Sequence, residues 1–326
     1  MADPLVSILM VARNSAPFIG AALASARAQS CADIEILVLD DGSTDDTRAI
    51  ALTHAAHDSR VRVMDGPGQG LAAIRAASLA AARGRYGAIL DSDDLIEPDH
   101  IAGLLAAAQA TGAEMVAANM IAFSDGPQGR RKALFAPGAA WGRARAVGLA
   151  EYVRSNCLYG RGVSLGYLKP MFRMDFLRDA AISYDRGLRI GEDYDLVLRA
   201  MLAGGRFWYV PQASYHYRRH AGSTSARLPL ADIEALIAAE QRHVWPDDSA
   251  VQAAARARMG SLEMAARHAR AVAALKGRQP AAAVAALGLS WPAWRLMARS
   301  LQETIARRCQ ALAAPAPGPV GAAVQA

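Results

Sequence analysis

The sequence predicts an α/β fold, with a mostly parallel sheet covered by helices on both faces. In the first 120 residues, short apolar runs alternate with helical segments, and two of the runs end in clusters of aspartate. Strands that are buried on both faces appear as continuous apolar runs, whereas half-exposed strands alternate polar and apolar residues. Ligands of such sheets bind at the carboxyl ends of the strands, so the aspartate clusters indicate where a site would lie.

The predicted strands and helices of this first part follow one another in regular order. Apolar runs predict strands at residues 6–11, 34–39, 61–64, 86–90 and 115–118. Helical patterns lie between them at residues 17–29, in the alanine-rich segment after Asp46, and at 70–82 and 98–110. Pro17 supports the start of the first helix, because proline fits the first turn.

The second part is less regular. From about residue 123 to 166 the pattern predicts loops rich in Gly, Pro and Arg. Order returns with residues 172–180, a helix at 192–203 and strands at 207–210 and 214–218. We therefore expect a main body at 1–227 that divides near residue 120, a helical extension at 228–312, and a tail at 313–326 with too little apolar surface to fold.

Composition narrows the class of protein. The chain has 326 residues, a formal charge of +6, 53% hydrophobic and 20% charged residues, which is a globular composition. The charge favours anionic partners such as phosphates or a lipid surface. Its arginines are spread along the chain, which does not favour nucleic acid, since that would need a dense basic face with aromatic platforms.

Targeting signals are not evident in the sequence. The three cysteines lie far apart without a CxxC pair, which favours free thiols in a reducing compartment. The first residues, MADPLVSILM, carry an acid and a proline where a signal peptide would be basic. No run reaches the length of a membrane span, so we expect a cytoplasmic protein that at most rests on a membrane surface.

The segment AILDSDD at residues 88–94 places three carboxylates directly after a predicted strand. Asp91 and Asp93, separated by one residue, could bind Mg²⁺ or Mn²⁺ through oxygen, and such cations share their remaining positions with substrate phosphates. The alternative is a solvated loop in which Asp94 caps the next helix.

Two further acidic segments could carry chemistry. In DDGSTDD at residues 40–46, Asp40 or Asp41 can accept hydrogen bonds from the donor edge of a base, although a capped strand-to-helix turn explains Gly42 onward equally well. Glu192 and Asp193 open a predicted helix, where a carboxylate that faces a cleft could act as a general base. Charged residues in a first helical turn are the alternative.

A basic, hydroxyl-rich loop completes the set. The segment YHYRRHAGSTS at residues 215–225 brings two histidines and two arginines around a glycine, which suits closure over a diphosphate. Any one of its residues could also be ordinary surface.

The four segments, in this order on a predicted α/β sheet, resemble the GT-A (Rossmann-like) inverting glycosyltransferases of family 2, over roughly residues 5–225. The resemblance implies a nucleotide-binding half at 1–120 and an acceptor and catalytic half at 121–227. It also implies these nucleotide contacts: Val11, Ala12, Arg13, Asn14, Asp40, Asp41, Gly68, Gln69, Arg75, Asp91 and Ser92. Arg13 and Gln69 depart from the residues that the family often has there.

The same resemblance assigns the reaction centre. It implies Asp193 as the general base with Glu192 beside it, and a divalent cation, Mn²⁺ or Mg²⁺, on Asp93 and His220. His216 is the less favoured alternative to His220. Candidates for contact with the diphosphate or the acceptor are Lys169, Arg161, Arg218 and Arg219.

A narrower likeness concerns the segments GYLKP, RIGEDYD and YRRH, which are similar to those of bacterial glucosyltransferases that build succinoglycan-type exopolysaccharides. It implies transfer of a hexose such as glucose from a nucleotide-diphosphate sugar, with UDP expected, to a saccharide hydroxyl on a lipid-linked intermediate. Two other functions stay open: a non-catalytic sugar-nucleotide binder of the same fold, which would not need Asp193, and a sugar nucleotidylyltransferase, which should have a Gly-rich loop after its first strand.

The last third is rich in arginine and contains the sequence WPAW at residues 291–294. A basic helix with interfacial tryptophan fits a membrane surface, as a lipid-linked acceptor would require. The alternative is a set of helices that pack on the catalytic domain with their arginines in water.

Overall fold

A computed structural model describes residues 3–124, 131–160, 162–220, 228–300 and 302. The chain forms two compact units, Met1–Leu262 and Glu263–Ala326, which we describe separately. The first unit therefore includes helix α8 (Leu230–Arg242) and the first half of helix α9 (Ser249–Lys276). The domain boundaries expected from the sequence stay predictions, and the expected tail at 313–326 lies outside the described residues.

The first four long strands form one half of the sheet. β1 (Val6–Ala12), β2 (Ile34–Asp40), β3 (Val61–Asp65) and β4 (Tyr86–Ile89) are parallel and lie in the order β3-β2-β1-β4. β1 and β2 are buried along almost their whole length, as continuous apolar runs predict. The α/β class and the mostly parallel sheet are thus confirmed.

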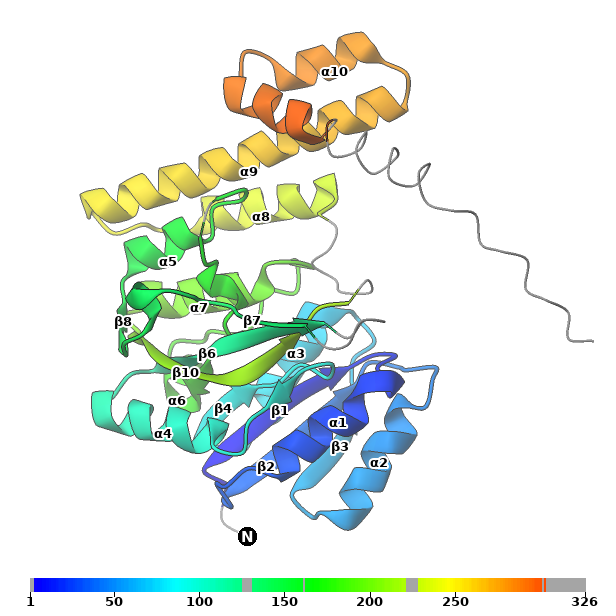
Figure 1. Cartoon of the computed structure of the whole chain (residues 1–326), viewed down its shortest axis with the longest axis vertical. Coiled ribbons are helices and arrows are strands. Elements are labelled where there is room, and N and C mark those ends of the chain that lie inside the picture. Colours follow the sequence, from blue (N-terminus) through cyan, green and yellow to red (C-terminus); the bar gives the residue numbers. More distant parts are fainter. Residues whose placement is uncertain (1–2, 125–130, 161, 221–227, 301, 303–326) are drawn as a thin grey trace, which may run out of the picture. The chain divides into compact units, whose positions relative to one another are not determined.

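Helices cover both faces of this half. The chain steps outward from β1 to β3 through α1 (Ala16–Arg27) and α2 (Thr47–His57), and returns to β4 through α3 (Leu71–Ala81). Because crossovers between parallel strands are right-handed, the outward and return connections lie on opposite faces. Figure 1 shows α1 and α2 in front of the sheet, with α3 behind it.

The second half continues the same sheet but mixes strand directions. β9 (Met171–Arg173) lies between β4 and β6 (Met115–Ser124) and is antiparallel to both. Beyond β6 lies β10 (Phe207–Arg218), parallel to it, and α4 (His100–Thr111) contacts both strands. The two short strands that the sequence predicts at 207–218 form one strand whose register shifts between Val210 and Tyr215. Pro211 lies in that stretch, and a bulge accommodates a residue without an N–H.

One short pairing matters for the site. β5 (Leu95–Ile96) follows the DSDD segment directly and is antiparallel to Tyr215 and His216 of β10. This pairing brings the end of β4 next to the end of β10.

The prediction of loops between about 123 and 166 was wrong. That region contains, besides the end of β6, the elements β7 (Arg131–Leu134), η1 (Ala139–Trp141), β8 (Arg145–Val147), α5 (Leu149–Ser155) and η2 (Leu165–Tyr167). Every residue of β7 is exposed, so the strand has no apolar run that could reveal it. It forms through pairing with β6, a tertiary contact that outweighs local propensity.

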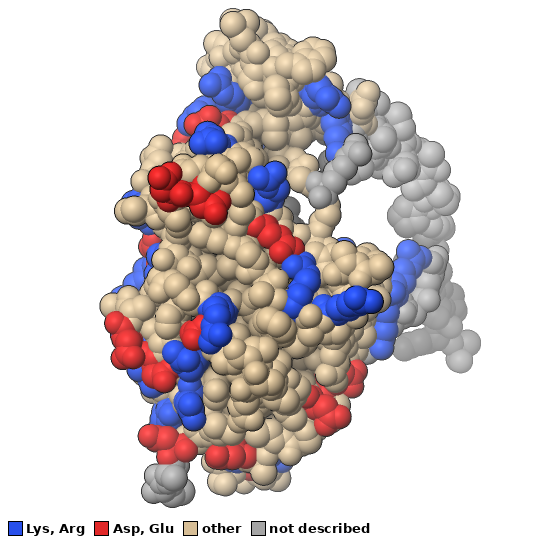
Figure 2. Space-filling model, turned by 90° about the vertical axis from the view of Figure 1, so that its left-hand side faces the viewer, with Lys and Arg blue, Asp and Glu red and all other residues tan. Residues whose placement is uncertain are grey.

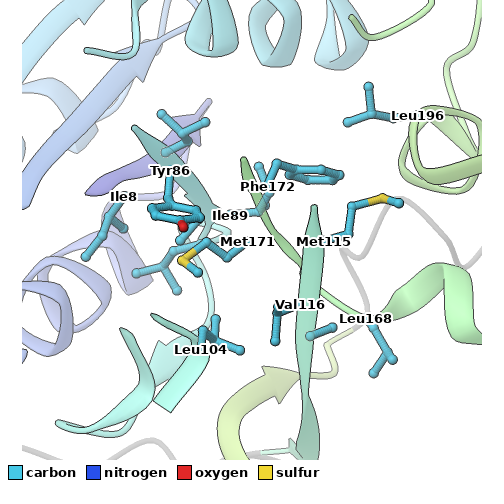
Figure 3. Close-up of a cluster of buried hydrophobic side chains, with 14 of the residues drawn as sticks. Ile8, Tyr86, Ile89, Leu104, Met115, Val116, Leu168, Met171, Phe172 and Leu196 are labelled. Carbon is cyan, nitrogen blue, oxygen red and sulfur yellow. The ribbon is translucent and has the colours of Figure 1, made fainter. Parts of the chain in front are cut away.

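The core joins the two halves. Met171 and Phe172 of β9 are buried among Tyr86 and Ile89 of β4 and Met115 of β6, as Figure 3 shows. Removing such side chains from water is the main stabilising contribution to a fold of this size. The strand ends that carry the acids are therefore fixed relative to one another. α6 (Met174–Asp179) follows β9 directly.

The part of the chain after β10 is helical, as expected, with α8 (Leu230–Arg242), α9 (Ser249–Lys276) and α10 (Pro280–Leu287). The helix α7 (Glu192–Leu202) lies before β10. Within the described part of the chain, none of the helices has the length and apolar character needed to cross a bilayer. On the face that Figure 2 shows, basic and acidic side chains are interspersed rather than gathered by sign.

The expectation that the arginines of this region face water or a membrane was wrong for Arg258. Its side chain is buried, its Nε lies 3.1 Å from Glu240 Oε1, and its guanidinium lies 4.7 Å from the centre of the Tyr194 ring. Arg258 also donates to the carbonyl oxygen of Asn156. A buried charge must be paired and hydrogen-bonded, and here it connects α9, α8 and α7.

Candidate active site

The loops after β1 and β2 are hydrogen-bonded to each other. Asp41 N donates to Ala12 O at 2.9 Å, and Thr44 N donates to Asn14 Oδ1 at 2.8 Å. Asn14 has φ of +51°, a conformation that asparagine adopts more readily than most residues. The expected nucleotide contacts Val11–Asn14 and Asp40–Asp41 therefore lie at one edge of the sheet, with the Arg13 side chain exposed.

Asp40 and Asp41 are both buried but have different partners. Ser43 N donates to Asp40 Oδ2 at 3.2 Å, as in a capped turn. Asp41 Oδ1 instead accepts from Gly68 N at 2.7 Å, so it fixes the segment after β3. Gln69 is exposed between two glycines of positive φ, Gly68 and Gly70.

Two buried cations join three acids at the centre of the site. Lys169 Nζ lies 2.8 Å from both Asp91 Oδ2 and Asp193 Oδ2. The Arg75 guanidinium lies 2.8 Å from Asp91 Oδ1 and 3.4 Å from Asp193 Oδ1 and Glu192 Oε1. Acids that follow β4 and acids at the start of α7 thus meet, which the family resemblance implies and the sheet-edge argument alone does not. We call these five residues the central cluster.

The cluster separates the pKa values of its two neighbouring acids. Burial opposes ionisation of Asp193, but Arg75 and Lys169 outweigh it and lower the pKa of this carboxyl. Burial and the charge of Asp193 raise the pKa of Glu192 to about 7. The Asp193 side chain is 18% exposed and that of Glu192 only 8%, so Asp193 is the more accessible of the two carboxyls.

Tyr184 is a site residue that the sequence analysis missed. Its hydroxyl donates to Asp193 Oδ1 at 3.1 Å, and the Arg75 guanidinium lies 5.8 Å from its ring centre. The residue lies in the connection between α6 and α7, outside the segments that carry a recognisable pattern, so only the fold reveals it.

Three aspartates at the end of β4 fit a hard divalent cation. Asp91, Asp93 and Asp94 each offer an oxygen, and these atoms lie within 4.8 Å of one another. Asp93 Oδ2 also lies 2.9 Å from His220 Nε2. Oxygen ligands of this kind suit Mg²⁺ or Mn²⁺.

The idea that Asp94 caps a following helix was wrong, because β5 follows instead. Asp94 is buried and accepts from Tyr215 Oη and from Arg218 N, each at 2.7 Å. Burial and the charges of Asp91 and Asp93 raise its pKa well above the usual range. Asp94 therefore attaches the DSDD loop to β10.

The structure brings His220, and not His216, to Asp93. His216 Nε2 lies 2.5 Å from Glu97 Oε1. Arg218 Nε donates to the carbonyl oxygen of Asp93 at 2.7 Å, and its guanidinium lies 4.5 Å from the centre of the Phe123 ring.

The remaining candidates do not pair with the acids of the central cluster, or they lie outside the described residues. Ser92 is buried and its Oγ lies 2.9 Å from Ser15 Oγ in the loop after β1. Arg219 has an exposed side chain, and Arg161 lies outside the described residues.

A cleft of about 580 Å³ opens beside His220. Three aromatic rings line it: Tyr167 lies between Phe135 and Tyr217, with ring centres 6.2 and 6.3 Å apart. The segment from Gly162 to Ser164 forms part of its wall. The three rings themselves were not predicted.

Comparison with known proteins identifies the family. The model of the family described as glycosyl transferase family 2 matches residues 7–173. The chain belongs to this family. This family 2 glycosyltransferase is 38% identical over 243 residues to the succinoglycan biosynthesis protein ExoO of Rhizobium meliloti (strain 1021), covering 73% of the chain and 67% of the relative. It is 34% identical over 246 residues to ExoU of the same organism, covering 72% and 68%.

Solved structures confirm the GT-A fold of the glycosyltransferase. S. aureus TarS 1-349, in complex with UDP-GlcNAc, matches with a TM-score of 0.60 at 20% identity and covers 82% of this chain and 71% of TarS. The mannosyltransferase PcManGT from Pyrobaculum calidifontis, in complex with GDP-Man and Mn²⁺, matches with a TM-score of 0.58 at 16% identity, covering 94% and 81%. At these identities the likeness concerns the fold alone.

Proposed function

We propose that this glycosyltransferase moves a hexose, glucose, from its UDP donor to a saccharide hydroxyl with inversion of the anomeric centre. The acceptor is a lipid-linked exopolysaccharide intermediate, so the enzyme works in the cytoplasm at the inner face of the membrane. The similarity to two succinoglycan biosynthesis proteins supports the pathway. The observation that carries the chemistry is the central cluster, in which Lys169 bridges Asp91 and Asp193.

The donor nucleotide occupies the edge formed by the loops after β1, β2 and β3. Asp40 ends β2 there, Asp41 follows it, and Gln69 is exposed on the neighbouring loop. Each buried carboxylate has a second lone pair for a base imide. Asp91 and Ser92 lie on the ribose side in this arrangement.

Asp93 and His220 hold the divalent cation. When bound, Mn²⁺ or Mg²⁺ supplies positive charge that stabilises the diphosphate leaving group. Arg218, attached to the backbone of Asp93, adds a fixed cation on the same side. Charge that is already in place costs no reorganisation during the reaction.

Asp193 acts as the general base. It accepts the proton of the acceptor hydroxyl while that oxygen forms a bond to the anomeric carbon and the bond to diphosphate breaks. Lys169 and Tyr184 orient its carboxylate, and the lowered pKa keeps it ionised. A single displacement of this kind gives inversion.

The acceptor saccharide enters the aromatic cleft beside His220. The apolar C–H face of a sugar ring matches the electron-rich face of an aromatic ring, and Phe135, Tyr167 and Tyr217 supply three such faces. Polar groups at the same wall, including Ser164 and Arg219, can orient the hydroxyls.

A donor screen tests this proposal. The purified chain with Mn²⁺ is mixed with UDP-, GDP- and TDP-sugars, and both thermal shift and release of nucleoside diphosphate are measured. UDP-glucose should stabilise the protein and give the fastest release. A donor that binds but is never cleaved, with acceptor saccharides present, would favour a non-catalytic sugar-nucleotide binder. Release of pyrophosphate from UTP and glucose 1-phosphate would favour a nucleotidylyltransferase.

A further inference from the structure

The C-terminal unit exposes a group of large apolar side chains. Trp291 is 71% exposed, Leu289 is fully exposed, Val284 is 55% and Trp294 is 38% exposed. We call these four residues the Trp291 surface. Scattered single apolar residues are normal on a protein surface, but a contiguous group indicates an interaction site.

Local hydrogen bonds connect Val284 and Trp294 of this group through Gly288. Trp294 Nε1 donates to the carbonyl oxygen of Gly288 at 2.9 Å, and Gly288 N donates to that of Val284 at 3.0 Å. Gly288 has φ of +53° and so permits the turn that ends α10. Leu289 and Trp291 lie within that turn or directly after it.

The exposure does not result from a missing core. The opposite sides of the same segments pack into a core of their own, which contains Ala271, Ala283, Leu287, Ala293 and Met297. Ala293 and Met297 are four residues apart and therefore face inward together, whereas Trp291 faces elsewhere. The unit thus buries one apolar side and leaves a second one in water.

The charged residues of this part of the unit are mostly basic. Residues 263–300 contain six Lys or Arg and a single acid, Glu263. Arg295 is exposed and follows Trp291 by four residues, so it lies on the same side one turn further. Arg267 Nη1 lies 3.4 Å from the position that a Cβ on Gly288 would occupy. An anionic partner is therefore complementary to this region.

We propose that the Trp291 surface binds the anionic leaflet of a membrane, with its tryptophans at headgroup depth and Leu289 inserted beneath them. Tryptophan prefers the interface, where its ring is buried and its N–H still has a partner. Nearby Arg side chains add attraction to anionic headgroups. The inference rests on the membrane location proposed above, but on no step of sugar transfer.

Vesicle flotation tests it with the full chain. Wild type is mixed with phosphatidylcholine vesicles that contain either no or about one third phosphatidylglycerol. The double variant Leu289→Ser/Trp291→Ser is compared with Leu52→Ser, which changes an exposed leucine on α2. We expect wild type and Leu52→Ser to float with the anionic vesicles only, and the double variant to float at least about 10-fold less. Brominated lipids should quench the fluorescence of wild type more than that of Trp291→Phe.

Every other outcome overturns the inference. If the double variant floats like wild type, another surface binds lipid. If wild type stays with the soluble fraction and light scattering shows a dimer that the double variant loses, a second copy covers the surface. If wild type floats only after removal of residues 303–326, the chain covers its own surface. Because all variants are also assayed for donor cleavage, the two proposals can fail separately. Wild type that cleaves the donor but does not float with anionic vesicles refutes only the membrane contact, and wild type that floats but cleaves no donor refutes only the transfer function.

Discussion

Lys169 is the residue on which the geometry of the site most depends. Its ammonium lies 2.8 Å from one oxygen of Asp91 and one of Asp193. Two carboxylates that contact the same ammonium are close enough to repel each other, and the cation between them offsets this repulsion. The sequence makes Lys169 a candidate for contact with the diphosphate or the acceptor, and that role stays a prediction. In the fold its ammonium holds the carboxylates of Asp91 and Asp193 in place.

Replacing this lysine should therefore disturb the orientation of the Asp193 carboxylate and raise its pKa. In Lys169→Met, transfer should fall by about 100-fold. Lys169 lowers the pKa of Asp193. Without Lys169 that pKa rises, so the carboxyl of Asp193 stays protonated up to a higher pH. The acid limb of the pH–rate profile should move upward. Lys276→Met, at an exposed position in α9, serves as the control, and an unmoved acid limb in Lys169→Met would argue against an Asp193 base.

At the scale of elements, contacts with α8 and α9 hold α7 in position. Arg258 of α9 pairs with Glu240 of α8 and packs on the ring of Tyr194, which directly follows Asp193. The Asn156 backbone that Arg258 also contacts precedes the wall of the aromatic cleft. The buried ion pair thus supports both the start of α7, where Asp193 lies, and the wall of the aromatic cleft.

Breaking this ion pair should destabilise the protein strongly. Arg258→Met leaves Glu240 buried without its partner, which costs about 3–5 kcal/mol. Arg256→Met, at an exposed position two residues away, should change stability by less than about 0.5 kcal/mol. Urea unfolding of both variants measures the difference, and the double variant Arg258→Met/Glu240→Leu should recover much of the loss. Equal midpoints for Arg258→Met and Arg256→Met would contradict the described role.

At the scale of the whole molecule, the first half of the fold was predictable. Strands such as β2 are apolar throughout, and their order along the chain implies a parallel sheet. Because carboxyl ends of parallel strands share one edge, Asp41 and Asp91 could be placed at a common site without coordinates. Asp193 could be joined to them only through the family resemblance.

The rest depends on contacts between segments distant in sequence. β9 is three residues long and antiparallel within a mostly parallel sheet, and no local pattern marks it. Tyr184 and the ring of Tyr167 reach the site because of where α7 and η2 pack. Arg258 looks like any surface arginine until Glu240 is seen beside it.

Sugar transfer should require a divalent cation, and the two residues proposed to hold it come from different halves of the sheet. Asp93 follows β4 and His220 follows β10. Exhaustive treatment with EDTA should reduce transfer to below about 1% and added Mn²⁺ should restore it. Asp93→Asn should raise the Mn²⁺ concentration needed for half-maximal activity. Unchanged activity after chelation would remove the cation from the mechanism.

The central claim is that Asp193 removes the proton of the acceptor, and the variant Asp193→Asn tests it most directly. The amide keeps the shape of the side chain but cannot accept this proton, whereas Glu192→Gln changes the neighbouring and less exposed acid. Single-turnover transfer and donor affinity are measured for both variants. We predict that Asp193→Asn binds the donor like wild type and loses about two to four orders of magnitude in transfer, while Glu192→Gln loses less than about 10-fold. Transfer by Asp193→Asn at nearly the wild-type rate, or a larger loss in Glu192→Gln, would contradict the assignment.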